Sequence, residues 1–278
     1  MFLRNTMAAF GGISAAVQFF DQLFPRDFPD PGAVTLASVA LGVAWGAVRA
    51  RTKSVVRQEF RHPAMTVVVQ AGDLFEQPGH LVVGFSDTFD TAEGGGLLIN
   101  DTSVQGQLLA RRYGGDVQRL DGELSTALAA VAPSAREAPE RKPLGKLDRY
   151  PVGTVAVLGA RPRFVFASAY SRIGNDYVAS SSVEEFWYSL NRLWDAVHRH
   201  AQRECVAMPL IGSGLSRLDY LDEESLLRLI LLSFVAHSRE RAICRELRVV
   251  LRPADLARIN VPEVEAFLAT LASGLGGT

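Results

Sequence analysis

The sequence of 278 residues lacks the features that mark several large classes of protein. Its formal net charge is −1, so it has no basic excess of the kind that nucleic-acid-binding proteins use against phosphates. It has only two cysteines, Cys205 and Cys244, and their apolar surroundings predict buried free thiols in a reducing compartment. Its five histidines form no His-Glu-x-x-His or similar pattern, and we therefore expect no structural metal.

Charge is also missing from one stretch near the N-terminus. Residues 32–48 read GAVTLASVALGVAWGAV, and as a helix they would span about 26 Å, close to the hydrocarbon thickness of a bilayer. A weaker apolar segment covers residues 6–24, and the prolines between the two segments predict a short turn. Basic residues flank both ends of this pair, whereas the turn is mainly acidic, which places both ends in the cytoplasm. We therefore predict a two-helix transmembrane hairpin in residues 1–53 and a cytoplasmic domain in residues 54–278.

Two other interpretations of the N-terminal region remain open. Gly42 and Gly46 form a Gly-x-x-x-Gly motif, and small residues of this kind favour close contacts between helices. A soluble helical hairpin that packs on the globular domain or mediates self-association is therefore the second interpretation. A cleaved signal peptide is the third, although the second and stronger apolar segment does not fit such a peptide.

Short β-rich runs alternate with helical patterns in the rest of the chain. Capping residues start two of the helices: Ser182 with Glu185 forms a capping box, and Asp222 precedes a run, residues 226–235, that is apolar on all sides. That run is too short to cross a membrane and predicts a buried helix. Brief apolar runs predict buried strands at 67–69, 81–85, 154–158, 164–167, 206–209 and 247–251, with an edge strand at 54–60.

The alternation of strands and helices predicts an α/β fold, specifically a three-layer α/β/α domain with a mixed sheet. Residues 132–149 interrupt this alternation with a stretch rich in Pro, Arg, Lys and Glu that has no periodicity. Because a strand pattern resumes directly afterwards, we interpret this stretch as an exposed loop within the domain.

The sharpest local motif is MPLIGSGLSR, at residues 208–217. A strand ends at Pro209, and Gly212 and Gly214 allow backbone amides to turn inward and approach a phosphate. No Gly-Lys-Ser/Thr follows, so the motif is not a Walker loop, and its spacing does not match the Gly-x-Ser-x-Gly nucleophile elbow. A purely structural Gly-x-Gly turn is the alternative.

Three further polar segments follow predicted strands or open a helix. A carboxylate at Asp73, after Gly72, can accept a hydrogen bond from an adenine amino group, or it can cap a turn. Residues 86–91, SDTFDT, follow the second strand of the domain, and residues 102–107, TSVQGQ, open a helix whose N-terminal amides suit an anion.

In this order, these segments resemble the macro domain, a module that binds ADP-ribose. The resemblance covers residues 55–270, and its best-matched pieces are Gly72-Asp73 and residues 209–214. The whole arrangement, two apolar N-terminal segments followed by a divergent macro domain with SVQGQ and MPLIGSGLS, is similar to the membrane-macro effectors of Thoeris anti-phage defence.

The resemblance implies a function as well as a fold. In that family, a partner TIR-domain enzyme makes an ADP-ribose derivative from NAD, the macro domain senses it, and the membrane segment then damages the cell's own membrane. We therefore expect a receptor at the bacterial inner membrane that forms a homo-oligomer and binds this signal, with no cofactor, metal or nucleic acid.

The resemblance also implies a set of site residues. Asp73 would meet the adenine, and residues 103–107 and 212–216 would surround the diphosphate. Residues 86–91 and 102–106 replace the segments in which hydrolase subclasses carry catalytic groups, so we expect no catalytic residue. The predicted ligand contacts are Asp73, Leu74, Phe85, Ser86, Asp87, Thr88, Phe89, Asp90, Thr91, Ser103, Val104, Gln105, Gly106, Gln107, Tyr170, Pro209, Ile211, Gly212, Ser213, Gly214, Leu215 and Ser216.

Two alternatives to a receptor remain. An ADP-ribosyl hydrolase would need a carboxylate that activates water near the distal ribose, and Asp87, Asp90 and Glu93 are the candidates. A membrane-tethered scaffold with a degenerate macro fold would bind no ADP-ribose derivative at all.

Overall fold

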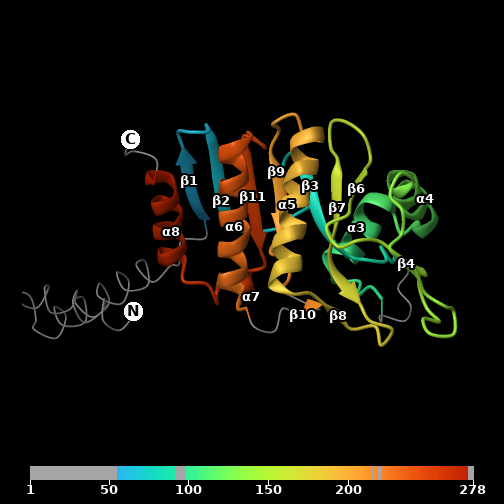
Figure 1. Ribbon diagram of the computed structural model, residues 1–278. Coiled ribbons are helices and arrows are strands. Elements are labelled where there is room, and N and C mark those ends of the chain that lie inside the picture. Colours follow the sequence, from blue (N-terminus) through green and yellow to red (C-terminus); the bar gives the residue numbers. More distant parts are fainter. Residues whose placement is uncertain (1–54, 92–97, 214–215, 218–220, 275–278) are drawn as a thin grey trace, which may run out of the picture. The chain divides into compact units, whose positions relative to one another are not determined.

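The computed structural model describes residues 55–91, 98–213, 216–217 and 221–274 (Figure 1). The chain divides into two units, Met1–Lys53 and Ser54–Thr278, and every described residue belongs to the second. The predicted transmembrane hairpin therefore lies outside the described residues. Among the helices that the structure describes, none is long and apolar enough to cross a bilayer.

Nine strands of the described residues form one mixed sheet (Figure 1). Its centre is parallel, in the order β2, β11, β9, β3 and β7, while β1 is antiparallel to β2, and β6 and β8 are antiparallel to β7. The short β10 pairs in parallel with β8, and β4 and β5 form a separate antiparallel pair. The bounds are β1 Val55–Phe60, β2 Met65–Ala71, β3 His80–Ser86, β4 Ala135–Arg136, β5 Asp148–Arg149, β6 Val155–Leu158, β7 Val165–Ile173, β8 Ala179–Ser180, β9 Val206–Pro209, β10 Ser216–Arg217 and β11 Glu246–Leu251.

The central strands are apolar because both of their faces are covered. Val67, Val68 and Val69 of β2 are all buried, and so are Leu81, Val82 and Val83 of β3. Continuous apolar runs of this kind are typical of parallel strands between two helical layers. Each of the seven predicted strands is present, and the mixed sheet is confirmed.

Helices cover the two faces of the sheet and complete the predicted three-layer fold (Figure 1). On one face, Trp194 of α5 and Phe234 of α6 meet edge to face, with ring centroids 5.2 Å apart. On the other, Leu108 of α3 and Leu124 of α4 pack into a second buried cluster with Val83 of β3. The helices are α3 Val104–Tyr113, α4 Val117–Leu128, α5 Val183–His200, α6 Glu223–Glu240, α7 Pro253–Leu256 and α8 Val261–Ser273.

The helix starts follow the predicted capping residues. Ser182 and Glu185 form the capping box at the start of α5, and the Asp222 side chain accepts the amide of Ser225 at the start of α6. The predicted buried run lies within α6 and contributes Ile230 and Phe234 to the core, although Leu232 is 37% exposed. One side of α6 therefore faces solvent.

The prediction for residues 132–149 needs a correction. Most of this loop is exposed, but it contains strands β4 and β5, and the side chain of Lys142 is fully buried. Lys142 is buried because it pairs with Asp90, a residue far away in sequence.

Candidate functional site

The predicted site segments meet at one edge of the sheet. Strands β2, β11, β9 and β3 are parallel neighbours, so their carboxyl ends lie at the same edge. Gly72-Asp73 follows β2, residues 87–91 follow β3, and residues 210–213 follow β9. In open α/β sheets, ligands bind in the crevice outside the carboxyl ends of the strands. The fold therefore brings together three segments that are far apart in the sequence.

Asp73 is held in a turn and in an ion pair. One carboxylate oxygen accepts the amide of Phe75 at 2.8 Å, and the other accepts Nη1 of Arg111 at 2.6 Å. The side chains of Asp73 and Arg111 remain 28% and 45% exposed. Partial burial raises the pKa of Asp73, but the bonds from Arg111 and from the Phe75 amide outweigh it and hold the pKa below its usual value. The carboxylate is thus charged and reachable from solvent.

The first predicted phosphate loop is built around the start of α3. The Ser103 hydroxyl accepts the amide of Gly106 at 3.1 Å, which makes Ser103 the N-cap of the helix. A Cβ on Gly106 would lie 2.6 Å from the Asn100 carbonyl oxygen, so only glycine allows the loop to approach the helix this closely. Val104, Gln105 and Gln107 are half-buried on the same first turn. The positive end of the helix dipole lies at this turn.

The second predicted phosphate loop leaves the sheet after Pro209. Ile211 is buried, Gly212 has the positive φ of 91° that favours glycine, and the Ser213 hydroxyl donates to the Leu210 carbonyl at 2.9 Å. Gly214 and Leu215 lie outside the described residues. Ser216 belongs to β10 and pairs with Ala179 of β8, which ties the end of this loop to the β7–β8 connection.

Tyr170 lies between the sheet and α5, next to the second loop. Its ring packs edge to face with Phe186 of α5, with centroids 6.3 Å apart. A Cβ on Gly84 would come within 2.5 Å of the Tyr170 ring and 3.3 Å of Ile211. Gly84 of β3 therefore makes room for both predicted site residues.

Three other predicted residues have apolar side chains in the core. Leu74, Phe85 and Phe89 are 6%, 1% and 0% exposed, and the last two rings stack with centroids 5.6 Å apart. They belong to the cluster under α3 and α4. Any contact that they make with a ligand is therefore limited to their backbone.

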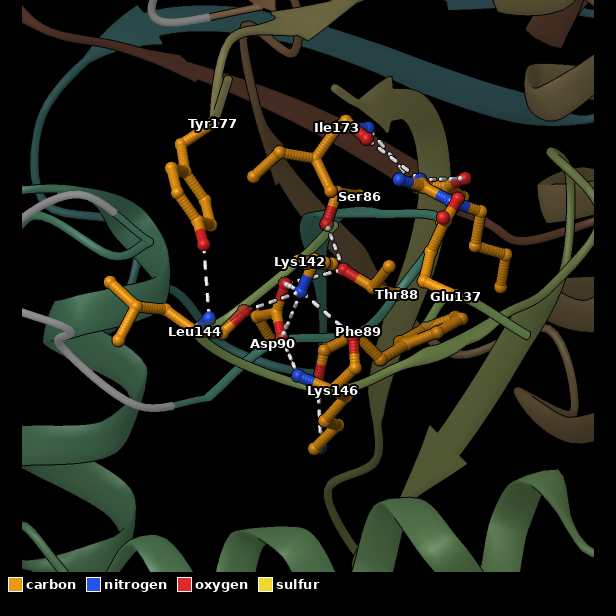
Figure 2. Close-up of polar contacts among 12 residues, drawn as sticks. Ser86, Thr88, Phe89, Asp90, Glu137, Lys142, Leu144, Lys146, Ile173 and Tyr177 are labelled. Carbon is orange, nitrogen blue, oxygen red and sulfur yellow. Dashed lines mark hydrogen bonds and ion pairs between the residues drawn. The ribbon is translucent and has the colours of Figure 1, made fainter. Parts of the chain in front are cut away.

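Segment Ser86–Thr91 is a buried polar turn whose side chains bind protein groups. Asp90 pairs with Lys142 and accepts bonds from the Thr88 hydroxyl and the Lys146 amide (Figure 2). Ser86 contacts the Thr88 hydroxyl at 3.2 Å. At the far end of the turn, the Thr91 hydroxyl donates to Asp121 of α4. The structure thus places this segment at the site edge with its side chains turned into the protein.

Asp87 is the centre of a second ion-pair network. It is fully buried and accepts Nη1 of Arg149 at 2.9 Å and the Ile173 amide at 2.9 Å. Arg149 also bonds Glu137 at 2.6 Å and Asn175 at 3.0 Å. Bonds from Arg149 and Asn175 lower the pKa of Glu137. Burial lowers the pKa of Arg149, but its bonds to Glu137 and Asp87 more than offset this, so the pKa is raised.

Three basic residues of this region were not predicted from the sequence. Arg111 pairs with Asp73, Lys142 with Asp90, and Arg149 with Asp87. None stands in a recognisable motif, and the partners are 38, 52 and 62 residues apart. Within the part of the chain that the structure describes, no group of three or more His, Cys, Asp or Glu side chains could hold a metal ion.

The fold is that of macrodomains. A macrodomain variant from Oceanobacillus iheyensis matches 80% of this chain and 96% of its own, with a TM-score of 0.52 and 13% identity. A second variant of that macrodomain, solved with ADPR, matches 76% of this chain and 96% of its own, with a TM-score of 0.50 and 13% identity. At such low identity these likenesses show the fold alone.

Sequence comparison identifies the particular family. The family model described as Thoeris protein ThsA, Macro domain, matches residues 67–252. Thoeris protein ThsA of Bacillus amyloliquefaciens (strain Y2) is 26% identical over 210 residues, which cover 72% of this chain and 67% of that protein. The chain therefore belongs to the ThsA macro-domain family of Thoeris proteins. The predicted resemblance to Thoeris macro domains is confirmed, while the membrane hairpin stays a prediction.

Proposed function

We propose that this protein is a receptor and effector of anti-phage defence. Its macro domain binds an ADP-ribose-derived signal that a TIR-domain enzyme makes from NAD. Binding drives assembly of the N-terminal hairpins at the bacterial inner membrane, and the assembled hairpins disrupt that membrane. The observation that carries the proposal is the match of residues 67–252 to the ThsA macro domain, in a chain whose first 50 residues contain two apolar segments.

The geometry of the site edge supports a nucleotide ligand. The start of α3 and the glycine turn at Gly212 suit two phosphates, and the exposed carboxylate of Asp73 suits an adenine amino group. A macrodomain of the same fold has been solved with ADPR. These features support a ligand in which a diphosphate is attached to an adenine nucleoside.

The buried carboxylates favour a receptor over a hydrolase. Asp87 and Asp90 are 0% and 2% exposed, and each is paired with a cation. A general base must lie within hydrogen-bond reach of the water that it activates, and these two carboxylates face protein groups instead. Glu93, the third candidate, lies outside the described residues.

Ligand binding can drive assembly only if the ligand prefers the assembled state. A ligand that binds both states equally shifts nothing, whereas a shift from 1:99 to 99:1 needs a preference of about 10⁴-fold. The signal is therefore expected to bind the oligomer far more tightly than the resting protein.

Dye release from vesicles tests the proposal. The full chain is reconstituted into dye-loaded vesicles, and ADP-ribose, NAD or the product of a TIR-domain NADase is added. We expect release only with an ADP-ribose derivative, together with larger cross-linked species and an intact ligand. Release without ligand, or steady hydrolysis of the ligand without release, would contradict the proposal.

A further inference from the structure

Lys142 is a buried lysine in a loop that is otherwise polar and mostly exposed. Its side chain is 0% exposed, and Nζ lies 3.1 Å from Oδ2 of Asp90 (Figure 2). The same ammonium group donates to the carbonyls of Leu144 at 3.0 Å and Lys146 at 2.7 Å. An ammonium group has three donors, and these three partners match them.

The pair fixes the segment to which Asp90 belongs. Asp90 also accepts the Lys146 amide, so both the side chain and the backbone of the loop hold the same carboxylate. Removing one partner of a buried pair leaves an uncompensated charge, whereas replacing both by neutral groups of similar volume is often tolerated. The position of the Ser86–Thr91 turn therefore depends on Lys142.

The loop turns directly over this ion pair at Gly145. Gly145 has a φ of 79°, and a Cβ there would lie 2.3 Å from Oδ1 of Asp90 and 2.8 Å from Nζ of Lys142. The residue is exposed, yet its backbone touches a pair of buried charges. A side chain added at this exposed position would therefore displace Asp90, which belongs to the Ser86–Thr91 turn.

A second set of contacts joins the loop to the other side of the site. Arg149 bonds Asp87 of the turn and the carbonyl of Ile173 at the end of β7. The Tyr177 hydroxyl accepts the Leu144 amide at 2.9 Å (Figure 2). The segment 174–178 that carries Tyr177 leads into β8, which pairs with β10 at the end of the second phosphate loop. The Ser86–Thr91 turn is thus connected, through the loop and segment 174–178, to β8 and to β10 at the end of the second phosphate loop.

We propose that residues 132–149 form a brace that sets the geometry of the ligand site, with Lys142 and Arg149 as its positioning residues. The brace holds the Ser86–Thr91 turn and connects it with the second phosphate loop. Its effect on affinity rests on the proposed function, because it presumes that an ADP-ribose derivative binds at this edge of the sheet.

A double-mutant cycle in the full chain tests the brace. Lys142→Met leaves Asp90 unpaired, and we expect binding of the ADP-ribose derivative that the wild type binds to weaken by at least about tenfold. Lys142→Met/Asp90→Asn removes both charges but does not restore the donor to the Leu144 and Lys146 carbonyls. We therefore expect its affinity to recover at least about threefold relative to Lys142→Met. Equal affinity of Lys142→Met and the wild type, or no recovery in the double variant, overturns the proposal.

Hydrogen exchange separates this proposal from the proposed function. Without ligand, Lys142→Met is expected to lose amide protection in residues 86–91 and 173–180 while the α5 and α6 amides stay protected. The double variant is expected to restore part of this protection. If the wild type binds no ADP-ribose derivative, the proposed function fails, but these amides still test the brace. If the amides of residues 86–91 and 173–180 are as protected in Lys142→Met as in the wild type, the brace proposal is overturned.

Two glycine variants give a milder and matched comparison. Gly145→Ala adds a collision with the ion pair to the strain of a positive φ. Gly114→Ala, at a φ of 64°, adds the strain alone, because nothing lies within 4 Å of its Cβ. We expect only Gly145→Ala to weaken binding and to expose residues 86–91 to exchange. Equal behaviour of the two variants contradicts a brace at Gly145.

Discussion

Asp73 is the residue at which turn formation, an ion pair and proposed adenine recognition coincide. Its two oxygens are bound by the Phe75 amide and by Arg111, and Arg111 also lies over the Phe75 ring at 5.4 Å. The arginine therefore covers part of the carboxylate and offers a flat cation next to it. An adenine that bonds Asp73 would compete with Arg111 or stack beside it.

Asp73→Ala is expected to weaken ligand binding by at least about tenfold without unfolding the domain. The loss of stability should stay near about 1 kcal/mol, because the ion pair is partly exposed and one turn bond is lost. Arg111→Met is the control, since it removes the ion pair but keeps the carboxylate. Titration should show nearly normal binding for Arg111→Met. Equal losses of ligand affinity in the two variants would mean that binding depends on the Asp73–Arg111 ion pair and not on the carboxylate alone.

The pH dependence of Asp73 follows from its lowered pKa. A folded pKa below the ordinary value of 3.8 means that the charged form adds stability above that value and that the contribution is lost as the pH falls through the folded pKa. The Asp73 contribution should therefore be constant at neutral pH and disappear only in strong acid. Denaturation of the wild type and Asp73→Ala across this range checks the prediction.

Gly106→Ala is expected to displace the first phosphate loop. Its new Cβ would meet the Asn100 carbonyl oxygen and the Asp101 Cα at 2.6 and 2.7 Å, and both are backbone atoms. Overpacking of this kind costs about 1–3 kcal/mol. Gly122→Ala in α4, where nothing lies within 4 Å, should instead add up to about 1 kcal/mol of stability. Chemical denaturation and ligand titration of Gly106→Ala and Gly122→Ala check both expected effects.

At the scale of elements, two helix caps allow effects on stability to be distinguished from effects on ligand binding. Ser103 caps α3 at the proposed site, and Ser182 caps α5. Each serine-to-alanine change removes one cap and should cost about 1 kcal/mol in denaturation experiments. Only Ser103→Ala should also change ligand affinity, because its hydroxyl orders the turn that we propose for phosphate binding. A similar affinity loss in Ser182→Ala would contradict this assignment.

The strands could be predicted because a strand that is buried on both faces consists of a continuous run of apolar residues, which is visible in the local sequence. The starts of helices α5 and α6 could be predicted from their capping residues, which are also local features of the sequence. Helix α4 was not predicted, although Leu120, Leu124 and Leu128 recur at helical spacing and are all buried. That signal was present in the sequence.

The brace could not be predicted, because nothing local marks a buried charge. Lys142 stands next to exposed Pro, Arg and Glu residues, and its burial depends on Asp90, 52 residues earlier. Charged residues have no periodicity that reports their partners, so only the folded chain reveals the pair. The predicted ligand segments could be placed at one edge because each follows a strand, whereas the inward direction of the Asp87 and Asp90 side chains could not.

At the scale of the whole molecule, the chain divides between Lys53 and Ser54. Among the described residues, two buried clusters give the second unit a hydrophobic core of its own. We expect a protein that starts at Ser54 to fold, to bind the ligand and to be harmless to cells. Thermal denaturation, titration and growth after induction check these outcomes. Toxicity of the truncated protein would contradict a membrane mechanism.

The central claim is that the macro domain binds an ADP-ribose-derived signal without consuming it. The most direct measurement is a calorimetric titration of the purified full chain with ADP-ribose, NAD, and cyclic and amino-acid-linked ADP-ribose, followed by analysis of the nucleotide afterwards. We expect binding of one derivative with a micromolar or lower Kd and recovery of that nucleotide unchanged. Absence of heat with every derivative, or conversion of the bound one, would contradict the claim.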